Sequence, residues 1–455
     1  MLELSCALIA DPCTLRVCNQ KAPAGGTMEA DLFDEVRALG AHWQRLKPTQ
    51  RHAFLACFLG WALDAFDYFL LVLCIPAIAT EFHTGTKAVL EAVSLTLLFR
   101  PVGALLFGTL AERFGRRPTL IFNIACYSLL ELACAFAPSL PVLLVLRALF
   151  GIAMGGEWGV GAALVFETLP VEGRGFFSGV LQEGYAVGYL LAALVFGVLF
   201  DPLAHLHVAG HVVGWRGLFV VGALPGLLCL YINRKVEESP TWTQGRAQAA
   251  LPGQRRAALW TGMRAHLGTF LFLVLLMAGF NAFSHGTQDL YPTFLIKDHH
   301  ASAHEVGLIG VIYNIGAIGG GILFGALSER WGRKRAIITA ALLALPCVPL
   351  FALAHSLPLL ALGAFLMQFM VQGAWGVVPA YLSELSPAET RATFPGVAYQ
   401  LGNLLTSRNI VLQGWAAARV GAYGPVLAGT VLIVGIFLAV VCSLGRESRG
   451  KKLVA

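Results

Sequence analysis

Charged residues are scarce in this sequence. Asp, Glu, Lys and Arg make up 13% of its 455 residues, whereas 57% are hydrophobic. Because a soluble domain carries about 25% charged residues, this composition argues against a protein that folds in water. The ten cysteines form no CxxC spacing and avoid the expected outer loops, so neither disulfides nor a zinc site is expected. The sequence shows no Ser/His/Asp set, metal-ligand cluster or phosphate-binding loop, which argues against an enzyme.

The chain is rich in long apolar runs. A helix needs about 20 apolar residues to cross a bilayer, and runs of that order recur along almost the whole sequence. We expect twelve spanning helices, at residues 53–80, 88–111, 118–137, 140–167, 174–200, 216–232, 267–296, 305–327, 336–354, 357–383, 394–419 and 422–444. The expected fold class is therefore an all-α membrane protein.

The formal net charge of +6 is distributed unevenly over the loops. Basic residues cluster before the first expected helix, after the second, after the eighth and after the last. They include Arg37, Arg45, Lys47, Arg51, Arg113, Arg116, Arg117, Arg330, Arg333, Lys334, Arg335, Arg446, Arg449, Lys451 and Lys452. This is the positive-inside pattern, which predicts cytoplasmic termini in a cell inner (plasma) membrane of bacterial type. The expected partner is the lipid bilayer, and nucleic acid is not expected.

The first residues of the chain differ from the rest. Residues 1–27 contain Cys6, Cys13 and Cys18 but no apolar core with a basic flank of the signal-peptide type. Met28 begins a more ordinary lead-in, so we expect it to be the native start. N-terminal sequencing that finds residues 1–27 in the native protein would contradict this.

The sequence repeats itself at a constant offset, the one that separates Gly108 from Gly325. Several separate matches share this offset, as expected for two duplicated units in the same membrane orientation. They also pair Glu112 with Glu329, Arg116 with Arg333, Glu167 with Glu384, Pro170 with Pro387, and Arg174 with Arg391. The expected organisation is an N-terminal segment 1–52, bundles at 53–232 and 267–444, a cytoplasmic linker 233–266 and a tail 445–455.

The motif Gly-x-x-x-Glu-Arg-x-Gly-Arg-Arg begins at Gly108 and is echoed from Gly325. It resembles the signature loop of the major facilitator superfamily, and Arg147 with Gly151 resembles that superfamily's second signature. The resemblance implies two bundles that rock about a central site, and a monomer as the working unit. We assign gating and topology to Glu112, Arg113, Arg116, Glu329, Arg330 and Arg333, whose place at the membrane edge makes a direct substrate role improbable.

Ionisable side chains inside expected helices are functional candidates because burying them in a membrane is costly. The informative set is Asp64, Asp67, Arg100, Arg147, Glu157, Glu183, His285, Asp289 and Arg408. Glu131 is isolated in the third expected helix, which favours a structural or lipid-edge role. In the seventh, Asn281, Ser284, His285, Gln288 and Asp289 recur at helical spacing on one face, which predicts a cavity lining.

The segment Asn281-x-x-Ser284-His285-x-Thr287-Gln288-Asp289-x-x-x-Thr293 resembles the helix 7 motif of fungal Jen-type lactate/pyruvate:proton symporters. Those belong with bacterial lactate and sialate:proton symporters in one branch of the superfamily. Asp64-Ala65-Phe66-Asp67, Gly155-Gly156-Glu157-Trp158-Gly159 and Tyr399-Gln400-Leu401-Gly402-Asn403 look like the same branch. The resemblance implies that Asn281, His285 and Asp289 are needed to move a small monocarboxylate anion with a proton.

A carboxylate substrate needs a cation or several donors in a dry site. Arg408, near the middle of the eleventh expected helix, is the first candidate, and Arg147 is the second unless it serves coupling or packs against Glu157. Arg100 is expected to neutralise Asp64 or Asp67. The remaining substrate-binding candidates are Asn281, Ser284, Gln288 and Asn403.

Proton coupling needs a group that titrates near the working pH, such as a histidine beside an acid or a buried carboxyl. The candidates are His285, Asp289, Asp64, Asp67 and Glu157. The proton is the expected coupling ion, and no metal or other cofactor is expected, since His299, His300 and His304 fall in an outer loop that favours solvated side chains. The expected function is proton-coupled symport of a lactate- or pyruvate-like monocarboxylate. Alternatives are a sialic-acid or aromatic-acid symporter of the same fold and, less favoured, a membrane sensor that transports nothing.

Overall fold

The computed structural model describes residues 42–208, 211–248 and 264–451, and nearly all of them are helical. The N-terminal half consists of α2 (Pro48–Glu81), α3 (Thr86–Phe114), α4 (Arg116–Ala135), α5 (Leu140–Thr168), α6 (Arg174–Gln182), α7 (Gly184–Ala204), α8 (Gly214–Gly222), η1 (Leu224–Leu227) and α9 (Leu228–Lys235). Two short strands, β1 (His207–Val208) and β2 (His211–Val212), pair antiparallel in the loop before α8. Helix α10 (Pro240–Gln248) follows this half.

The C-terminal half repeats the arrangement. It consists of α12 (Leu267–Gln288), α13 (Tyr291–His299), α14 (Ala303–Trp331), α15 (Arg333–Leu343), η2 (Leu345–Cys347), α16 (Val348–Ala352), α17 (Leu357–Gly376), α18 (Val378–Leu385), η3 (Ala388–Thr390), α19 (Phe394–Thr406), α20 (Asn409–Val420) and α21 (Gly424–Leu444). Pairs such as α6 and α7, α12 and α13, and α17 and α18 each form one crossing interrupted by a residue or two.

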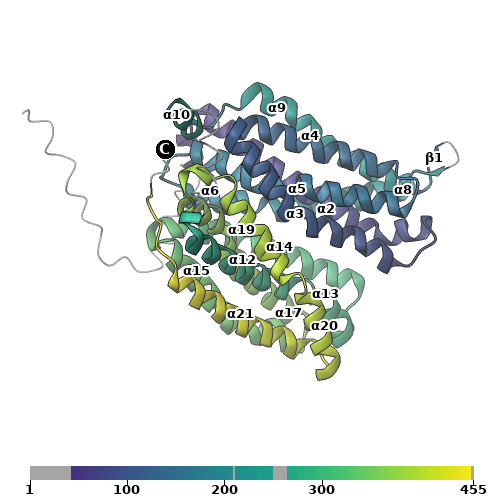
Figure 1. The fold of residues 1–455 in the computed structure, drawn as a ribbon. Helices are drawn as coiled ribbons and strands as arrows, with labels where there is room; N and C mark the ends of the chain where they lie inside the picture. The colour runs from purple at the N-terminus through teal and green to yellow at the C-terminus, as the bar shows by residue number, and fades with distance from the viewer. Residues whose placement is uncertain (1–41, 209–210, 249–263, 452–455) are drawn as a thin grey trace, which may run out of the picture.

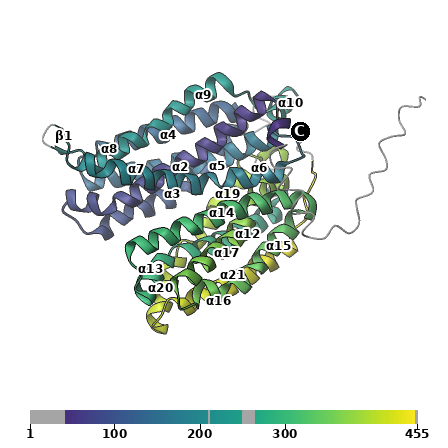
Figure 2. The ribbon, with the colours of Figure 1, turned by 180° about the vertical axis from the view of Figure 1, so that it is seen from behind.

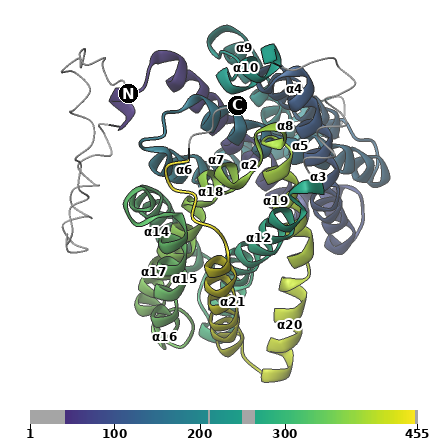
Figure 3. The ribbon, with the colours of Figure 1, turned by 60° about the vertical axis from the view of Figure 1, so that its left-hand side comes forward.

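Eleven helices of the described residues are long and apolar enough to cross a membrane. The expected eleventh crossing, 394–419, is not among these eleven; it consists of α19, of 13 residues, and α20, of 12. The turn between them falls at Ser407 and Arg408. Figure 3 shows α19 and α20 as two consecutive segments at the side of the C-terminal half. With this broken crossing included, the fold has the twelve expected crossings.

Glycines allow matching pairs of helices to touch backbone to backbone in the two halves. A Cβ added to Gly103 on α3 would lie 1.8 Å from the carbonyl oxygen of Ile152 on α5. The repeat partner Gly320 on α14 behaves the same way, with 1.9 Å to the carbonyl oxygen of Phe369 on α17. Small residues at helix contacts are the usual way to pack helices tightly in a membrane. The duplication seen in the sequence is therefore a duplication of packing as well.

The two halves meet at one end and diverge toward the other (Figures 1 and 2). We name the closed end, where α4 begins at Arg116 and α15 at Arg333, the basic end. Four close approaches join the halves there, and each needs a glycine. They are Gly108 with Thr393, Gly159 with Gly396, Gly175 with Gly325, and Gly179 with Gly321.

Both described ends of the chain lie at the basic end. The Trp43 ring is 6.5 Å from the ring of Phe177, near the start of α6. The carbonyl of Lys451 accepts a hydrogen bond from Arg174, the first residue of α6. A chain with an even number of crossings has both ends on the same side of the membrane. The position of the two ends therefore agrees with twelve crossings.

Candidate functional site

The centre of the N-terminal half contains a buried ion pair. Asp64 on α2 and Arg100 on α3 lie 3.6 Å apart, with side chains 0% and 5% exposed. The Arg100 guanidinium also donates to the sulfur of Met154 and lies 5.6 Å from the centre of the Tyr68 ring. The expected neutralisation of Asp64 by Arg100 is therefore present.

A second buried pair corrects two sequence-based interpretations. Arg147 on α5 contacts Glu131 on α4 at 2.6 Å, and both side chains are fully buried. Arg147 therefore pairs with Glu131 rather than with Glu157. Glu131 is not isolated, and of its two expected roles the ion pair agrees with the structural one and not with a place at the lipid edge. The guanidinium is held between the rings of Phe150 and Phe219, at 4.7 and 4.6 Å. An ion pair between consecutive helices is cheaper to bury than either charge alone, which explains why these two side chains turn inward.

Two further carboxyls are buried near these pairs without hydrogen-bond partners. Asp67 and Glu131 both border Gly222, because a Cβ there would meet Asp67 Oδ1 at 3.1 Å and Glu131 Cγ at 3.0 Å. Glu157 lies against Gly60, whose added Cβ would be 2.5 Å from Glu157 Oε1. None of the four carboxylate oxygens of Asp67 and Glu157 has a hydrogen-bond partner among the described residues.

This central cluster has more acids than bases. Within the described part of the chain it contains four buried carboxyls, those of Asp64, Asp67, Glu131 and Glu157, and two buried guanidiniums, those of Arg100 and Arg147. An unpaired buried carboxylate is far more costly than a neutral carboxyl. In this cluster, Asp64 and Glu131 each have a guanidinium partner, whereas Asp67 and Glu157 have no hydrogen-bond partner among the described residues.

The C-terminal half faces this cluster with a histidine and an acid. His285 lies on α12, and Asp289 directly follows the last residue of that helix. The distance between His285 Nδ1 and Asp289 Oδ1 is 3.2 Å, and the two side chains are 39% and 29% exposed. Arg100 interacts electrostatically with His285, and Asp289 does so with Tyr68 and Tyr185. The two halves thus bring their ionisable groups to one central region.

The predicted polar face of α12 is divided between two roles. The Gln288 amide donates to Gln368 at 3.1 Å, and that residue's amide donates in turn to Thr287 at 3.0 Å, so these contacts fasten α12 to α17. Ser284 is also turned toward α17, where it accepts from Gln372 at 3.4 Å. His285 and Asp289 are the members that stay substantially exposed.

Asn281 departs from the expected cavity lining. Its side chain is buried, with 2% of the residue exposed, and its amide donates to the backbone carbonyl of Met277 at 2.8 Å. Helical spacing gives the face of a residue but not the width of the exposed strip, so the strip at this end of α12 is narrower than predicted.

Arg408 lies at the break between α19 and α20, where its side chain is exposed. Within the described residues, the side chain of Arg408 makes no hydrogen bond or ion pair, and its backbone carbonyl accepts from the N–H of Leu412. Asn409 follows Arg408 and approaches α12, since a Cβ on Gly286 would lie 3.4 Å from Asn409 Nδ2. Asn403, one turn before, is half-buried. The helix break thus offers polar groups beside α12.

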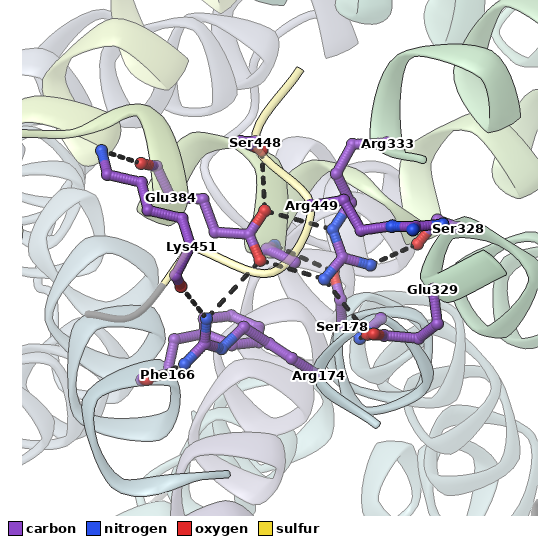
Figure 4. A network of polar contacts seen from close by, with 12 residues as sticks. Phe166, Arg174, Ser178, Ser328, Glu329, Arg333, Glu384, Ser448, Arg449 and Lys451 are labelled. Carbon is purple, nitrogen blue, oxygen red and sulfur yellow. Dashed lines mark hydrogen bonds and ion pairs between the residues drawn. The ribbon is translucent and has the colours of Figure 1, made fainter. Parts of the chain in front are cut away.

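The basic end is closed by a network that spans both halves (Figure 4). Glu384 at the end of α18 accepts from Arg333 at 3.0 Å and from Ser448 at 2.7 Å, and lies 3.6 Å from Arg174 of the other half. Glu329 accepts from the backbone N–H of Gly175, which also crosses between the halves.

The repeat builds the same network a second time. Glu167 at the end of α5 pairs with Arg116 at 3.0 Å and lies 3.6 Å from Arg391 of the other half. Glu112 pairs with Arg116 at 2.9 Å and accepts from the backbone N–H of Ala392 at 2.7 Å. Four predicted gating residues, Glu112, Arg116, Glu329 and Arg333, are therefore brought together with Glu167 and Glu384.

The other two predicted gating residues are exposed at the same end. Arg113 lies over the ring of Phe114 at 5.0 Å. The backbone carbonyl of Arg330 accepts from the guanidinium of Arg449. Both side chains face outward, whereas those of Arg116 and Arg333 are buried in the network.

Each network is completed by one Glu-Ser dipeptide, and both dipeptides were missed in the sequence. Glu238 accepts from the backbone N–H of Arg116, and the Ser239 hydroxyl donates to Glu167. Glu447 and Ser448 do the same for Arg333 and Glu384. The two dipeptides are closer together in the chain than the other repeat partners, so a search at one fixed offset passes over them. A Glu-Ser pair after the last crossing of each half is the signal.

Glu238 and Glu447, which accept from the backbone N–H groups at the starts of α4 and α15, differ in acidity. Burial raises the pKa of Glu447, but backbone N–H donors from Arg449, Arg333, Lys334 and Ser448 outweigh it and hold that pKa below its usual value. Burial is stronger at Glu238 and keeps its pKa raised despite similar donors.

No group of three or more metal-ligating side chains is found among the described residues. Of the outer-loop histidines, His299 packs edge-on against Phe294, with ring centres 4.8 Å apart. His300 adopts a left-handed backbone conformation at the end of α13.

Two pseudo-symmetric bundles that close at one end, with buried ion pairs at the centre of the N-terminal bundle, are the arrangement of a membrane transporter rather than of an enzyme. The chain belongs to the Major Facilitator Superfamily, whose family model matches residues 57–294 and 271–455. The membership expected from the signature loops is thereby confirmed, and the chain is a multi-pass membrane protein.

Relatives of known name are carriers of organic molecules. The chain is 28% identical to a carboxylic acid transporter protein homolog of Saccharomyces cerevisiae, over 80% of this chain and 61% of that protein. It is 29% identical to a probable 4-methylmuconolactone transporter of Cupriavidus pinatubonensis, over 86% and 89% of the two chains. Identity to the sialic acid transporter NanX of Escherichia coli is 25%, over 80% of this chain and 86% of that one.

The solved structure of the proton:xylose symporter XylE, bound to 6-bromo-6-deoxy-D-glucose, has the same fold. Its TM-score is 0.73 at 20% identity, and the match covers 89% of this chain and 98% of that chain.

Proposed function

We propose that this chain is a proton-coupled symporter of a short monocarboxylate, such as lactate or pyruvate, that works as a monomer by alternating access. The observation that carries the proposal is the excess of buried carboxyls around Arg100 and Arg147, facing His285 and Asp289 across the halves. Such a cluster binds protons, and its guanidiniums suit an organic anion. The carboxylic acid transporter homolog among the relatives supports this substrate class.

The Asp64–Arg100 pair suggests how the proton and the anion are coupled. While Asp64 is ionised, it occupies the guanidinium of Arg100. Protonation of Asp64 removes that partner and leaves a buried cation, which then favours a substrate carboxylate. Anion binding and proton binding thus support one another, and neither is favourable alone. Arg408 at the helix break is a second cation for the same anion.

We place the basic end in the cytoplasm of a bacterial-type inner membrane, as the positive-inside pattern supports. In that orientation the conformation seen here is closed to the cytoplasm. The network around Glu167 and Glu384 is then the cytoplasmic gate, with Glu112, Arg116, Glu329 and Arg333 as members.

Uptake into proteoliposomes tests the proposal. Purified protein is reconstituted, and the uptake of labelled lactate and pyruvate is measured with an inwardly directed proton gradient, in which the outside is more acidic. The control has equal pH on both sides. We expect accumulation above equilibrium only with the gradient. Uptake that is equal in both conditions, or no uptake of either acid, would contradict monocarboxylate:proton symport.

A larger or cyclic organic acid is the second candidate, favoured by the 4-methylmuconolactone and sialic acid transporters among the relatives. The same vesicles, offered labelled sialate and muconolactone, decide between the two. Gradient-driven accumulation of one of these without lactate or pyruvate would transfer the assignment.

A further inference from the structure

Glu183 is a buried acid outside the central cluster. It lies between α6 and α7 in the N-terminal half, is 3% exposed, and its Oε1 has no hydrogen-bond partner among the described residues. Helix α6 packs against α14 of the C-terminal half at the basic end. The carboxyl is therefore buried by the contact between the halves.

The surface that covers Glu183 is backbone. A Cβ on Gly321 of α14 would lie 2.0 Å from Glu183 Oε1 and 2.8 Å from its Cδ, so the carboxyl rests directly on this glycine. Helix α17 contacts α14 at the same place, because a Cβ added to Gly376 would lie 2.1 Å from the carbonyl oxygen of Gly321. Among the described residues, the side chains of α14 and α17 at this point offer the carboxyl no cation.

The groups around Glu183 on each neighbouring element are uncharged in the part of the chain that the structure describes. Tyr313 on α14 is the titratable group that interacts with it electrostatically. Helix α2 contributes Trp61, whose indole N–H donates to the carbonyl of Gln182 at 3.3 Å. A carboxylate in such surroundings has neither a counter-ion nor a set of donors, and the neutral carboxyl is the form that this site accommodates.

We propose that Glu183 is a second proton-binding site of this transporter: it holds a proton while the halves are closed at the basic end and releases it when they separate. Separation removes Gly321 from the carboxyl and admits water, which stabilises the ionised form. Proton release and opening of this end therefore favour each other, so rising pH favours the separated state. The proposal rests on proton coupling and adds a site to it.

The sequence repeat supplies the neutral counterpart of Glu183. At the offset that relates Gly108 to Gly325, position 183 corresponds to Gln400 on α19, which is also buried, with 2% of the residue exposed. An amide of the same shape is thus accommodated at this place in the duplicated scaffold. Glu183→Gln should therefore fold, and it removes only the ability to ionise.

A distance measurement across the basic end tests the site. Spin labels are placed on full-length protein in lipid nanodiscs through Arg234→Cys and Arg335→Cys, two exposed positions at this end, one on each half, in a background depleted of native cysteines. The populations of closed and separated halves are measured without substrate from about pH 5 to about pH 8, the range in which carboxyls of altered environment titrate. Glu183→Asp retains the acid, and Glu305→Gln is a matched control on α14.

We expect the separated fraction to rise with pH in the wild type, in Glu183→Asp and in Glu305→Gln. If the proton affinity of the site differs tenfold between the closed and the separated state, titration of the site changes the ratio of the two states about tenfold. In Glu183→Gln the ratio should change less steeply with pH than in the wild type, because one of the linked proton sites is gone. A response in Glu183→Gln as steep as in the wild type overturns the proposal, and so does a wild type without any pH response. Because no substrate is present, this result is independent of whether lactate is transported.

Discussion

Asp64 and Arg100 hold one another in a site where each would be costly alone. Their separation of 3.6 Å is that of an ion pair without an ideal hydrogen bond, and both oxygens of Asp64 have no hydrogen-bond partner among the described residues. Such a pair is readily exchanged for a protonated acid and a cation bound to substrate. The coupling proposed above depends on this exchange.

Asp64→Asn should uncouple transport from the proton. The amide imitates the protonated acid, so Arg100 is free to bind the anion at any pH, and substrate counterflow should persist. Accumulation driven by a pH gradient should fall at least about tenfold, since the linked protonation is gone. The measurement compares counterflow and gradient-driven uptake in the same vesicles, with Asp201→Asn, an exposed acid, as the control. Normal accumulation by Asp64→Asn would refute this coupling scheme.

His285 and Asp289 should matter for transport and little for folding. Their pair is partly exposed, and such pairs contribute at most about 1 kcal/mol to stability. His285→Ala and Asp289→Asn should therefore insert and melt like the wild type but lose gradient-driven accumulation. Uptake assays together with thermal melting of the purified variants check both halves of the statement. Wild-type uptake by both variants would remove them from the site.

Each half of the protein caps one helix with a glutamate from beyond its last crossing. Glu447 accepts from the first backbone N–H groups of α15, at Arg333 and Lys334, as Glu238 does for α4. An acid at a helix N-terminus satisfies free donors and favours the helix dipole. The caps fix the start of both helices that follow the signature loops.

Glu447→Gln should lower the stability of the protein by about 1 kcal/mol at neutral pH, the usual value of such a cap. The folded-state pKa of Glu447 is depressed, so its contribution is present above the ordinary carboxyl pKa and is lost as pH falls through the lower, folded value. The variant's deficit should thus shrink in acid. Thermal midpoints across pH measure this, with the exposed Glu237→Gln as control; a deficit that grows in acid would contradict it.

Much of the element-level design could be predicted because it repeats. Apolar run length and the offset shared by pairs such as Glu167 and Glu384 give the crossings, the two halves and four of the network's members. The break at Ser407 and Arg408 was not predicted, since neither residue is a helix breaker. The Arg147–Glu131 pair was also missed, because the rotation of one helix against the next depends on packing that a single sequence does not display.

For the whole molecule, two carboxylates at the basic end, Glu384 and Glu167, each contact basic side chains of both halves. Glu384→Gln would leave Arg333 and Arg174 without their shared anion, and breaking a buried pair costs about 3–5 kcal/mol. We expect the closed state to lose population to the separated one, seen as a longer distance between labels at positions 234 and 335. Glu167→Gln should act alike by the repeat, and the two changes together should add. Unchanged distances in both single variants would show that the network does not govern closure.

The Glu-Ser dipeptides have a consequence for how the protein could be divided. Arg116, Glu167 and Glu238–Ser239 close a ring within the first half, and its counterpart around Arg333 closes within the second. Each half therefore carries every residue of its own ring on its own stretch of chain. Two separate polypeptides, one ending near Gln248 and one starting near Arg264, should assemble when produced together. Their copurification through a tag on one of them would show that the two halves assemble without a covalent link.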